Sequence, residues 1–250
     1  MAIDTSKNSY TILFSIGMVV VVGGILAFLA ASLKPTIKKN EIIEVQQNIL
    51  YAMGINDNQN AGDIAFISTD VVEEEFKKYI KSQVVITGAT AIEDDKAYLI
   101  SVKTEQKLAK DPSHKRRLPL FIGEKDGKAI YVAPIRGKGL WDAIWGYVAM
   151  DKDMVVQGVF FDHKGETPGL GANIKQRYFM DDYTGEYLMA GDTFKGIAVA
   201  KGNNDPKNTD KTDNEVDALA GATITGDGVA AMVKSDLKLY VPYFNTLKNK

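Results

Sequence analysis

The stretch DALAGATITG, residues 217–226, sets a threonine among very small residues directly before a predicted helix. Gly221 and Ala222 leave the hydroxyl of Thr223 open to a bulky partner, and the backbone N–H groups of a helix start favour a phosphate nearby. A second interpretation is that Thr223 or Thr225 only caps the helix. From the residues alone the capping interpretation is favoured, because such caps are frequent.

Two stretches further towards the N-terminus also contain closely spaced glycines. GETPGLGA, residues 165–172, predicts a tight loop that brings backbone close to a flat ligand, or a plain turn. GKGLW, residues 137–141, predicts either a wall for an aromatic ligand or a loop anchored by its tryptophan. Neither stretch continues into a dinucleotide-binding fingerprint.

Taken together, the motifs resemble the FMN-binding domains of bacterial redox complexes. Their flavinylation motif reads Asp-x-x-[Ser/Thr]-Gly-Ala-[Thr/Ser], which Asp217, Gly221, Ala222 and Thr223 match, whereas Ala220 departs from it. ETPGLG is the second hallmark of these domains and stands at the expected distance before AGAT. The resemblance implies covalent FMN, joined through its phosphate to Thr223 by a dedicated flavin transferase.

The resemblance also implies a pocket built from three distant stretches. One stretch would pack on the flavin ring, and a second would reach it from the tight loop with backbone N–H groups and a hydroxyl. Lys201 would offset the charge of the phosphate or of reduced flavin, unless it is a solvated strand end. The expected cofactor-binding residues are Thr223, Gly139, Leu140, Trp141, Glu166, Thr167, Leu170, Gly171, Lys201, Ala222 and Thr225, with Thr225 contacting the phosphate.

A similar tripeptide, Gly88-Ala89-Thr90, lacks the acidic residue because Val84 stands in its place. We therefore expect Thr90 to be an ordinary strand or turn residue.

Bulk composition excludes several classes of function. The 250-residue chain has a net charge of −2, which gives no basic surface for nucleic acid. The absence of cysteine excludes disulfides and iron–sulfur ligation, and two histidines supply a metal site or a catalytic triad poorly. We expect no metal and no catalytic residues in the acid–base sense.

The segment Tyr10–Leu33 carries no charge and is long enough to cross a bilayer. It predicts a retained N-terminal anchor, because a cleaved signal peptide has a shorter apolar run. The lysines after it, Lys34, Lys38 and Lys39, favour a cytoplasmic main domain by the positive-inside rule, a rule that is weak for large domains. The resemblance instead implies a periplasmic one, because the flavin transferase acts outside the cytoplasm.

The pattern along the chain predicts an α+β fold with an antiparallel or mixed sheet and flanking helices. Residues 1–34 form the anchor, residues 35–83 a helical linker region and residues 84–250 the FMN-binding domain. Helices are expected at 36–54, from a cap at Thr69 or Asp70 to Ser82, and at 226–247, the last with its apolar stripe facing the core. Expected strands are 84–87, 97–102, 118–122, 129–135, 144–150, 154–162 and 194–200, with Asp126-Gly127 as a hairpin turn.

The length, the anchor and the motif order resemble the C subunits of sodium-translocating NADH:quinone oxidoreductases, and the G subunits of Rnf complexes are the close alternative. This resemblance implies an electron-relay component of a bacterial inner-membrane complex, coupled there to sodium transport. Its partners would be the other membrane and flavin subunits, the flavin transferase and the lipid bilayer. A membrane-anchored non-redox binding protein and a free-standing flavin reductase are the other interpretations that the residues leave open.

Overall fold

The structure, a computed structural model, describes residues 7–60, 62–202, 205 and 207–248. The chain separates into two compact units, one ending at Glu44 and the other beginning at Val45. The division falls inside the first helix, and each unit is described on its own below.

The first unit consists of most of helix α1, Asn8–Ala52. Among the described residues, α1 is the one helix that is long and apolar enough to cross a membrane. Its large apolar side chains from Ile12 to Ile37 are exposed. The helix continues through Pro35, so the helix expected at residues 36–54 is not a separate element. Inside a helix a proline removes one backbone hydrogen bond, because it has no N–H. The first six residues of the predicted anchor lie outside the described part.

The end of α1 belongs to the second unit and follows the sequence closely. The helix stops after Ala52, and Gly54 adopts φ +72, where glycine is favoured. The N–H of Gly54 donates to the carbonyl oxygen of Tyr51 at 2.9 Å, and that of Ile55 donates to Leu50 at 2.9 Å. The predicted stop at Gly54 is confirmed.

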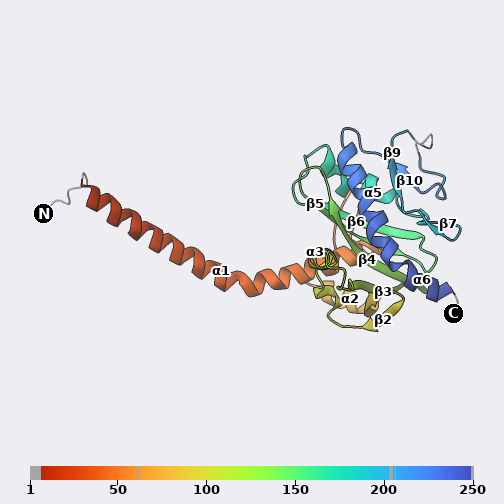
Figure 1. The fold of residues 1–250 in the computed structure, drawn as a ribbon, viewed down its shortest axis with the longest axis horizontal. Coiled ribbons are helices and arrows are strands. Elements are labelled where there is room, and N and C mark those ends of the chain that lie inside the picture. The colour runs from red at the N-terminus through yellow and green to blue at the C-terminus, as the bar shows by residue number, and fades with distance from the viewer. Residues whose placement is uncertain (1–6, 61, 203–204, 206, 249–250) are drawn as a thin grey trace. The chain divides into compact units, whose positions relative to one another are not determined.

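The second unit is built on a six-stranded antiparallel sheet with the order β2-β1-β3-β4-β5-β6 (Figure 1). Its strands are β1 Ile80–Thr87, β2 Thr90–Glu93, β3 Leu118–Lys125, β4 Lys128–Lys138, β5 Ala143–Met150 and β6 Val156–His163. Asp126 and Gly127, at φ +52 and +73, form the predicted hairpin turn between β3 and β4. The α+β class and the antiparallel sheet are confirmed, and Thr90 lies at the start of the exposed edge strand β2.

Helices cover both faces of this sheet. Helix α5, Thr223–Leu237, lies over one face of the sheet (Figure 1). On this face Gly137 in β4 lies against Met232 of α5. Gly123 in β3 faces the other side by strand alternation and lies against Met53, just after α1. After α5 the chain continues as the 3₁₀ turn η3, Lys238–Tyr240, and helix α6, Val241–Lys248. The apolar stripe predicted for this C-terminal region is buried in the core. Its members are Val229, Val233, Leu237, Tyr240 and Phe244.

Two strands predicted from the sequence are wrong. Residues 97–102 form the 3₁₀ turn η1 Ala97–Leu99 and the start of helix α3 Val102–Leu108, because the Ser101 hydroxyl accepts a hydrogen bond from the Thr104 N–H at 3.2 Å and caps this helix. Residues 194–200 are interrupted at Gly196, which has φ +77. This segment instead ends the hairpin β7 Met189–Ala190/β8 Thr193–Phe194 and then begins β9, Ala198–Ala200.

Two further boundaries differ from the expectation. Helix α2, Val72–Tyr79, begins without a side-chain cap, so the predicted caps Thr69 and Asp70 are wrong, and the chain becomes strand at Ile80 rather than after Ser82. Between β6 and the C-terminal helices lie the 3₁₀ turn η2 Gly171–Lys175, helix α4 Arg177–Asp181 and the strand β10 Glu215–Asp217, which pairs with β9 in parallel.

Candidate functional site

A cavity of about 300 Å³ lies where the three motif stretches meet. The loop after β4, the loop after β6, the end of β9 and the first turn of α5 all contribute to its wall. The lining residues are Leu140, Glu166, Thr167, Leu170, Gly171, Lys201, Gly221, Ala222, Thr223, Ile224 and Thr225. The structure thus brings every predicted site residue to this wall except Gly139 and Trp141.

The carboxylate of Glu166 joins the three stretches. It is only 4% exposed and accepts the backbone N–H of Trp141 at 2.9 Å, with longer bonds from Leu140 at 3.3 Å and Asp142 at 3.4 Å. The hydroxyl of Thr225, in the first turn of α5, donates to the same carboxylate at 2.5 Å. One side chain of the ETPGLG loop therefore ties together the GLW loop and the start of the helix.

These bonds determine the charge of Glu166. Burial alone raises the pKa of its carboxyl group, but the Thr225 hydroxyl and the three backbone N–H groups together outweigh that effect. The pKa of Glu166 lies below its ordinary value, so the side chain is a carboxylate at neutral pH. The cavity wall therefore contains a buried negative charge that hydrogen bonds satisfy, with no ion pair to a cation among the described residues.

The contacts around Glu166 are so close that two neighbouring positions, Gly171 and Gly139, have no room for a Cβ. A Cβ on Gly171 would collide with the Thr225 hydroxyl and would lie 2.7 Å from a Glu166 carboxylate oxygen. A Cβ on Gly139 would lie 2.6 Å from the other carboxylate oxygen. Gly139 therefore supports the site as a spacer against Glu166, and does not itself line the cavity.

The attachment stretch forms a turn and then a helix. Gly221 has φ +70 and abuts the Leu170 side chain, whose Cδ2 would be 2.8 Å from a Cβ at this position. Thr223 is the first residue of α5 and is exposed at the cavity. The N–H groups of this first helical turn have no partner within the helix and are donors for an anion.

The capping interpretation of the two threonines is wrong. The residue at the cap position is Ala222, whose side chain makes no capping hydrogen bond. Within the described part of the chain, the Thr223 hydroxyl makes no hydrogen bond, whereas the Thr225 hydroxyl gives its proton to Glu166. Thr225 can therefore offer a phosphate its backbone N–H but not its hydroxyl proton while that bond is made.

Lys201 reaches the cavity because β9 and β10 are parallel neighbours. Ala200 pairs with Asp217, and the N–H of Ala218 donates to the Ala200 carbonyl oxygen at 2.9 Å. This pairing places Lys201, the residue after β9, beside the segment that leads to Thr223. Its side chain is exposed, so solvent screens its charge.

Trp141 lies at the rim. It is 67% exposed, and its indole N–H donates to the Thr167 hydroxyl at 3.1 Å. Of the GLW stretch, Leu140 is the residue that lines the cavity. Sequence reasoning missed Ile224 and Gly221 as lining residues, although both stand in the attachment stretch. It also missed the Glu166–Thr225 bond, because nothing local links residues so far apart in the chain.

The described residues contain no group of three or more His, Asp or Glu side chains that could hold a metal ion. The arrangement offers a threonine hydroxyl, helix N–H donors, a lysine and two apolar walls, Leu140 and Leu170. This combination suits a ligand with a phosphate at one end and a flat apolar body at the other.

The chain is similar in sequence to a known domain family and to several named proteins. Residues 139–238 match the family model described as FMN-binding domain. The chain is 29% identical to the C subunit of the Na(+)-translocating NADH-quinone reductase from Neisseria meningitidis serogroup A, covering 98% of this chain and 96% of the relative. It is 28% identical to the protein of the same name from Pseudomonas aeruginosa, covering 90% of each.

Solved structures agree in fold. The crystal structure of the Na(+)-translocating NADH-quinone reductase C subunit from Parabacteroides distasonis superposes with a TM-score of 0.71 at 29% identity, covering 85% of this chain and 96% of that one. That of Shewanella oneidensis NqrC superposes with a TM-score of 0.67 at 25% identity, covering 84% and 99%. The likeness therefore extends over most of the chain.

Replacing Glu166 with glutamine should loosen the site. The amide keeps the size but offers one acceptor oxygen for four donors, so we expect a loss of about 1–3 kcal/mol in the free energy of unfolding at pH 7. Because the folded pKa of Glu166 is lowered, its contribution is present above the unfolded value and is lost as the pH falls through the folded value. The difference between wild type and Glu166→Gln should therefore shrink on acidification.

Denaturant unfolding of the full chain in detergent at pH 7 and at acid pH measures this difference. Glu93→Gln, which changes an exposed carboxylate on edge strand β2, is the matched control and should be neutral at both values. Equal stability of Glu166→Gln and wild type at pH 7 would show that the carboxylate does not hold the three stretches together.

Proposed function

We propose that this chain, which carries a domain of the FMN-binding family at residues 139–238, is an electron-transfer flavoprotein subunit of a membrane NADH:quinone reductase. The observation that carries the proposal is the cavity in which the exposed Thr223 hydroxyl meets the apolar walls Leu140 and Leu170. The relatives that match along nearly the whole chain are named as subunits of the Na(+)-translocating enzyme. FMN supplies the capacity to take up and release electrons, and the protein holds and orients it.

Attachment of FMN through its phosphate to Thr223 has three supports in the geometry. The hydroxyl is exposed and makes no hydrogen bond to the described residues, so it is available to react. The unpaired N–H groups of the first turn of α5 stabilise an anion at that position. Gly221 and Ala222 leave room for the approach of a flavin transferase and its activated FMN donor.

The same cavity gives the flavin ring its surroundings. Leu140 and Leu170 are 44% and 42% exposed, so their apolar surface is open for a ring to cover. The Thr167 hydroxyl and the loop N–H groups supply polar contacts at the rim. The Glu166 carboxylate holds the wall together and disfavours negative charge on the flavin ring, which lowers the flavin potential. Lys201 favours negative charge on the ring and raises the potential.

Within the complex, the chain would relay electrons between other subunits, and the coupling to sodium would belong to the assembly. Helix α1 would hold it in a bacterial inner membrane as a single span, with the main domain in the periplasm and the other membrane and flavin subunits as partners. The named relatives favour the sodium-translocating complex over the Rnf complex. If the chain were a non-redox binding protein, it would carry no flavin. If it were a free-standing reductase, it would reduce a small acceptor without other subunits.

Thr223→Ala should abolish flavin that survives denaturation, because the attachment oxygen is gone. In-gel flavin fluorescence after coexpression with a flavin transferase reads this out. Thr90→Ala, which changes the similar threonine on β2, should fluoresce like wild type. Fluorescence of the Thr223→Ala band at wild-type strength would overturn the assignment.

Leu170→Ala and Leu140→Ala should leave FMN attached but change its absorption and potential, because ring packing is lost while the ester remains. A loss of about 1–1.5 kcal/mol in differential packing corresponds to a shift of about 20–30 mV for a two-electron couple. Leu99→Ala removes another exposed leucine, one that does not line the cavity, and serves as the control. Unchanged spectra and potentials in both cavity variants would contradict the pocket and leave only the attachment.

A reporter fused after Lys250 tests the orientation. We expect activity from a reporter that works only outside the cytoplasm, because the flavin transferase must reach Thr223 there. Activity of a cytoplasm-only reporter at the same position would reverse the placement.

A further inference from the structure

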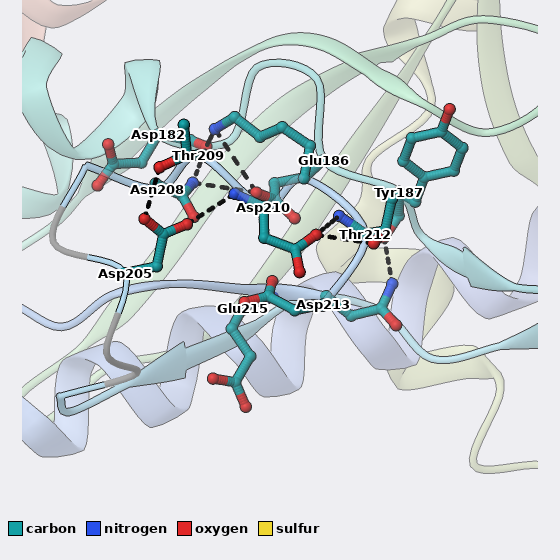
Figure 2. Close-up of polar contacts among 12 residues, drawn as sticks. Asp182, Glu186, Tyr187, Asp205, Asn208, Thr209, Asp210, Thr212, Asp213 and Glu215 are labelled. Carbon is teal, nitrogen blue, oxygen red and sulfur yellow. Dashed lines mark hydrogen bonds and ion pairs between the residues drawn. The ribbon is translucent and has the colours of Figure 1, made fainter.

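Between residue 202 and β10 the structure describes residue 205 and residues 207–214 (Figure 2). Hydrogen bonds from their own side chains hold this stretch together. Asp205 accepts hydrogen bonds from the Thr209 hydroxyl at 2.7 Å and the Asp210 N–H at 2.6 Å. Asp210 in turn accepts the N–H and the hydroxyl of Thr212 at 2.9 and 2.7 Å. These local bonds fix the shape of residues 207–214 but not their position on the domain.

The position is fixed by a buried carboxyl group, that of Glu186, which is 0% exposed. Asn208 donates through its amide to Glu186 at 3.0 Å and to the Asp182 carbonyl oxygen at 2.7 Å. The ammonium of Lys211 donates to the same carbonyl oxygen at 2.8 Å and lies 3.5 Å from the Glu186 carboxylate. We call these contacts of Asn208 and Lys211 with Glu186 and Asp182 the Glu186 latch. Asp182, Glu186 and Asn208 are labelled in Figure 2.

The latch is connected to the flavin site through the strands β9 and β10. The N–H of Ala198 donates to the Asn214 carbonyl oxygen at 2.8 Å, where the latched segment enters β10. The parallel β9–β10 ladder then sets Lys201 beside the attachment stretch. Val199 of β9 packs on Gly226 in α5, where an added Cβ would lie 3.0 Å away, so the ladder cannot shift freely against the helix that begins at Thr223.

We propose that Glu186 is a positioning residue of the flavin site: its buried carboxyl group holds residues 207–214 in place through Asn208 and Lys211, and thereby holds Lys201 near Thr223. The part concerning flavin rests on the proposed function. The part concerning the latch does not depend on any ligand.

Burial of Glu186 favours its neutral form, whereas its contacts with Asn208 and Lys211 favour the carboxylate. Burial, with a smaller contribution from the Asp213 carboxylate, raises the pKa of its carboxyl group to about 7 against the opposing effects of the Asn208 amide and the Lys211 ammonium. The other ionisable groups facing it are the buried Tyr183 phenol and Asp182, both beside α4. Glu186 Oε2 and Asn208 Oδ1 are buried without a partner among the described residues, so an ionised Glu186 would leave an acceptor charge unsatisfied there.

The direction of the pH dependence follows from linkage. The latched state binds the proton more tightly than an opened state in which Glu186 has its ordinary pKa. Closing therefore takes up a proton between the ordinary value and about pH 7, and the latched state loses stability as the pH rises through that window. The equilibrium for opening should grow by up to about tenfold per pH unit there.

Hydrogen exchange of the unmodified full chain in detergent tests the latch at a series of pH values from about 5.5 to 8, after correction for the intrinsic exchange rate. We expect the protection of residues 207–215 to fall as the pH rises in wild type, and to be high and independent of pH in Glu186→Gln. Asp192→Asn removes an exposed carboxylate in the β7–β8 turn and should follow wild type. Wild-type protection without this pH dependence, or a Glu186→Gln chain that follows wild type, overturns the latch.

The potential of the FMN-loaded protein tests the link to Lys201. Asn208 has φ +45, so Asn208→Gly removes the latch side chain without backbone strain. We expect this variant to lower the flavin potential, because Lys201 moves away from the charge of the reduced flavin. The shift should disappear when Lys201→Met is already present.

The outcomes separate the two proposals. A shift of equal size in the Lys201→Met background, or no shift at all, overturns the positioning role. A chain that takes up no FMN refutes the proposed function, and with it the link to Lys201, while the exchange experiment still decides whether the latch exists.

Discussion

The site depends on one buried carboxylate. Glu166 accepts four hydrogen bonds, three from the backbone of the GLW loop and one from Thr225 in the first turn of α5. A carboxylate out of water is costly unless its lone pairs are satisfied, so the two loops and the helix must come together around it. Gly139 and Gly171 are glycines because a Cβ at either position would collide with this group.

This constraint places the proposed flavin site on rigid elements. The GLW loop follows β4, the ETPGLG loop follows β6 and Thr223 opens α5, so each of these walls of the cavity lies at the end of an element that is packed in the domain. Once these ends are fixed, the free hydroxyl of Thr223 and the helix N–H groups direct an anion to one end of the cavity, and Leu140 and Leu170 leave the other end apolar. A tethered flavin with a tuned potential needs such a fixed surround more than it needs an acid or a base.

Local patterns predicted much of the fold. The Asp126-Gly127 turn, the stop at Gly54 and the buried C-terminal stripe each follow from a few neighbouring residues, and all three are confirmed. The strand predicted at residues 97–102 is wrong because the apolar pattern outweighed the Ser101 helix cap in the prediction. The strand predicted at 194–200 is interrupted by Gly196, which has a left-handed φ.

The cavity residues follow from motif resemblance, but the roles of three of them do not. Gly139 as a spacer, Trp141 as a rim residue and Thr225 as a partner of Glu166 depend on contacts across long sequence separations, which no local pattern encodes.

The central claim is that this cavity holds FMN on Thr223, and peptide mapping by mass spectrometry tests it most directly. The full chain is coexpressed with and without a flavin transferase, digested and fragmented. The account predicts that only the coexpressed chain gains the mass of FMN less one water, and that fragmentation assigns it to Thr223. An unmodified chain after coexpression, or an adduct on any other residue, would contradict the account.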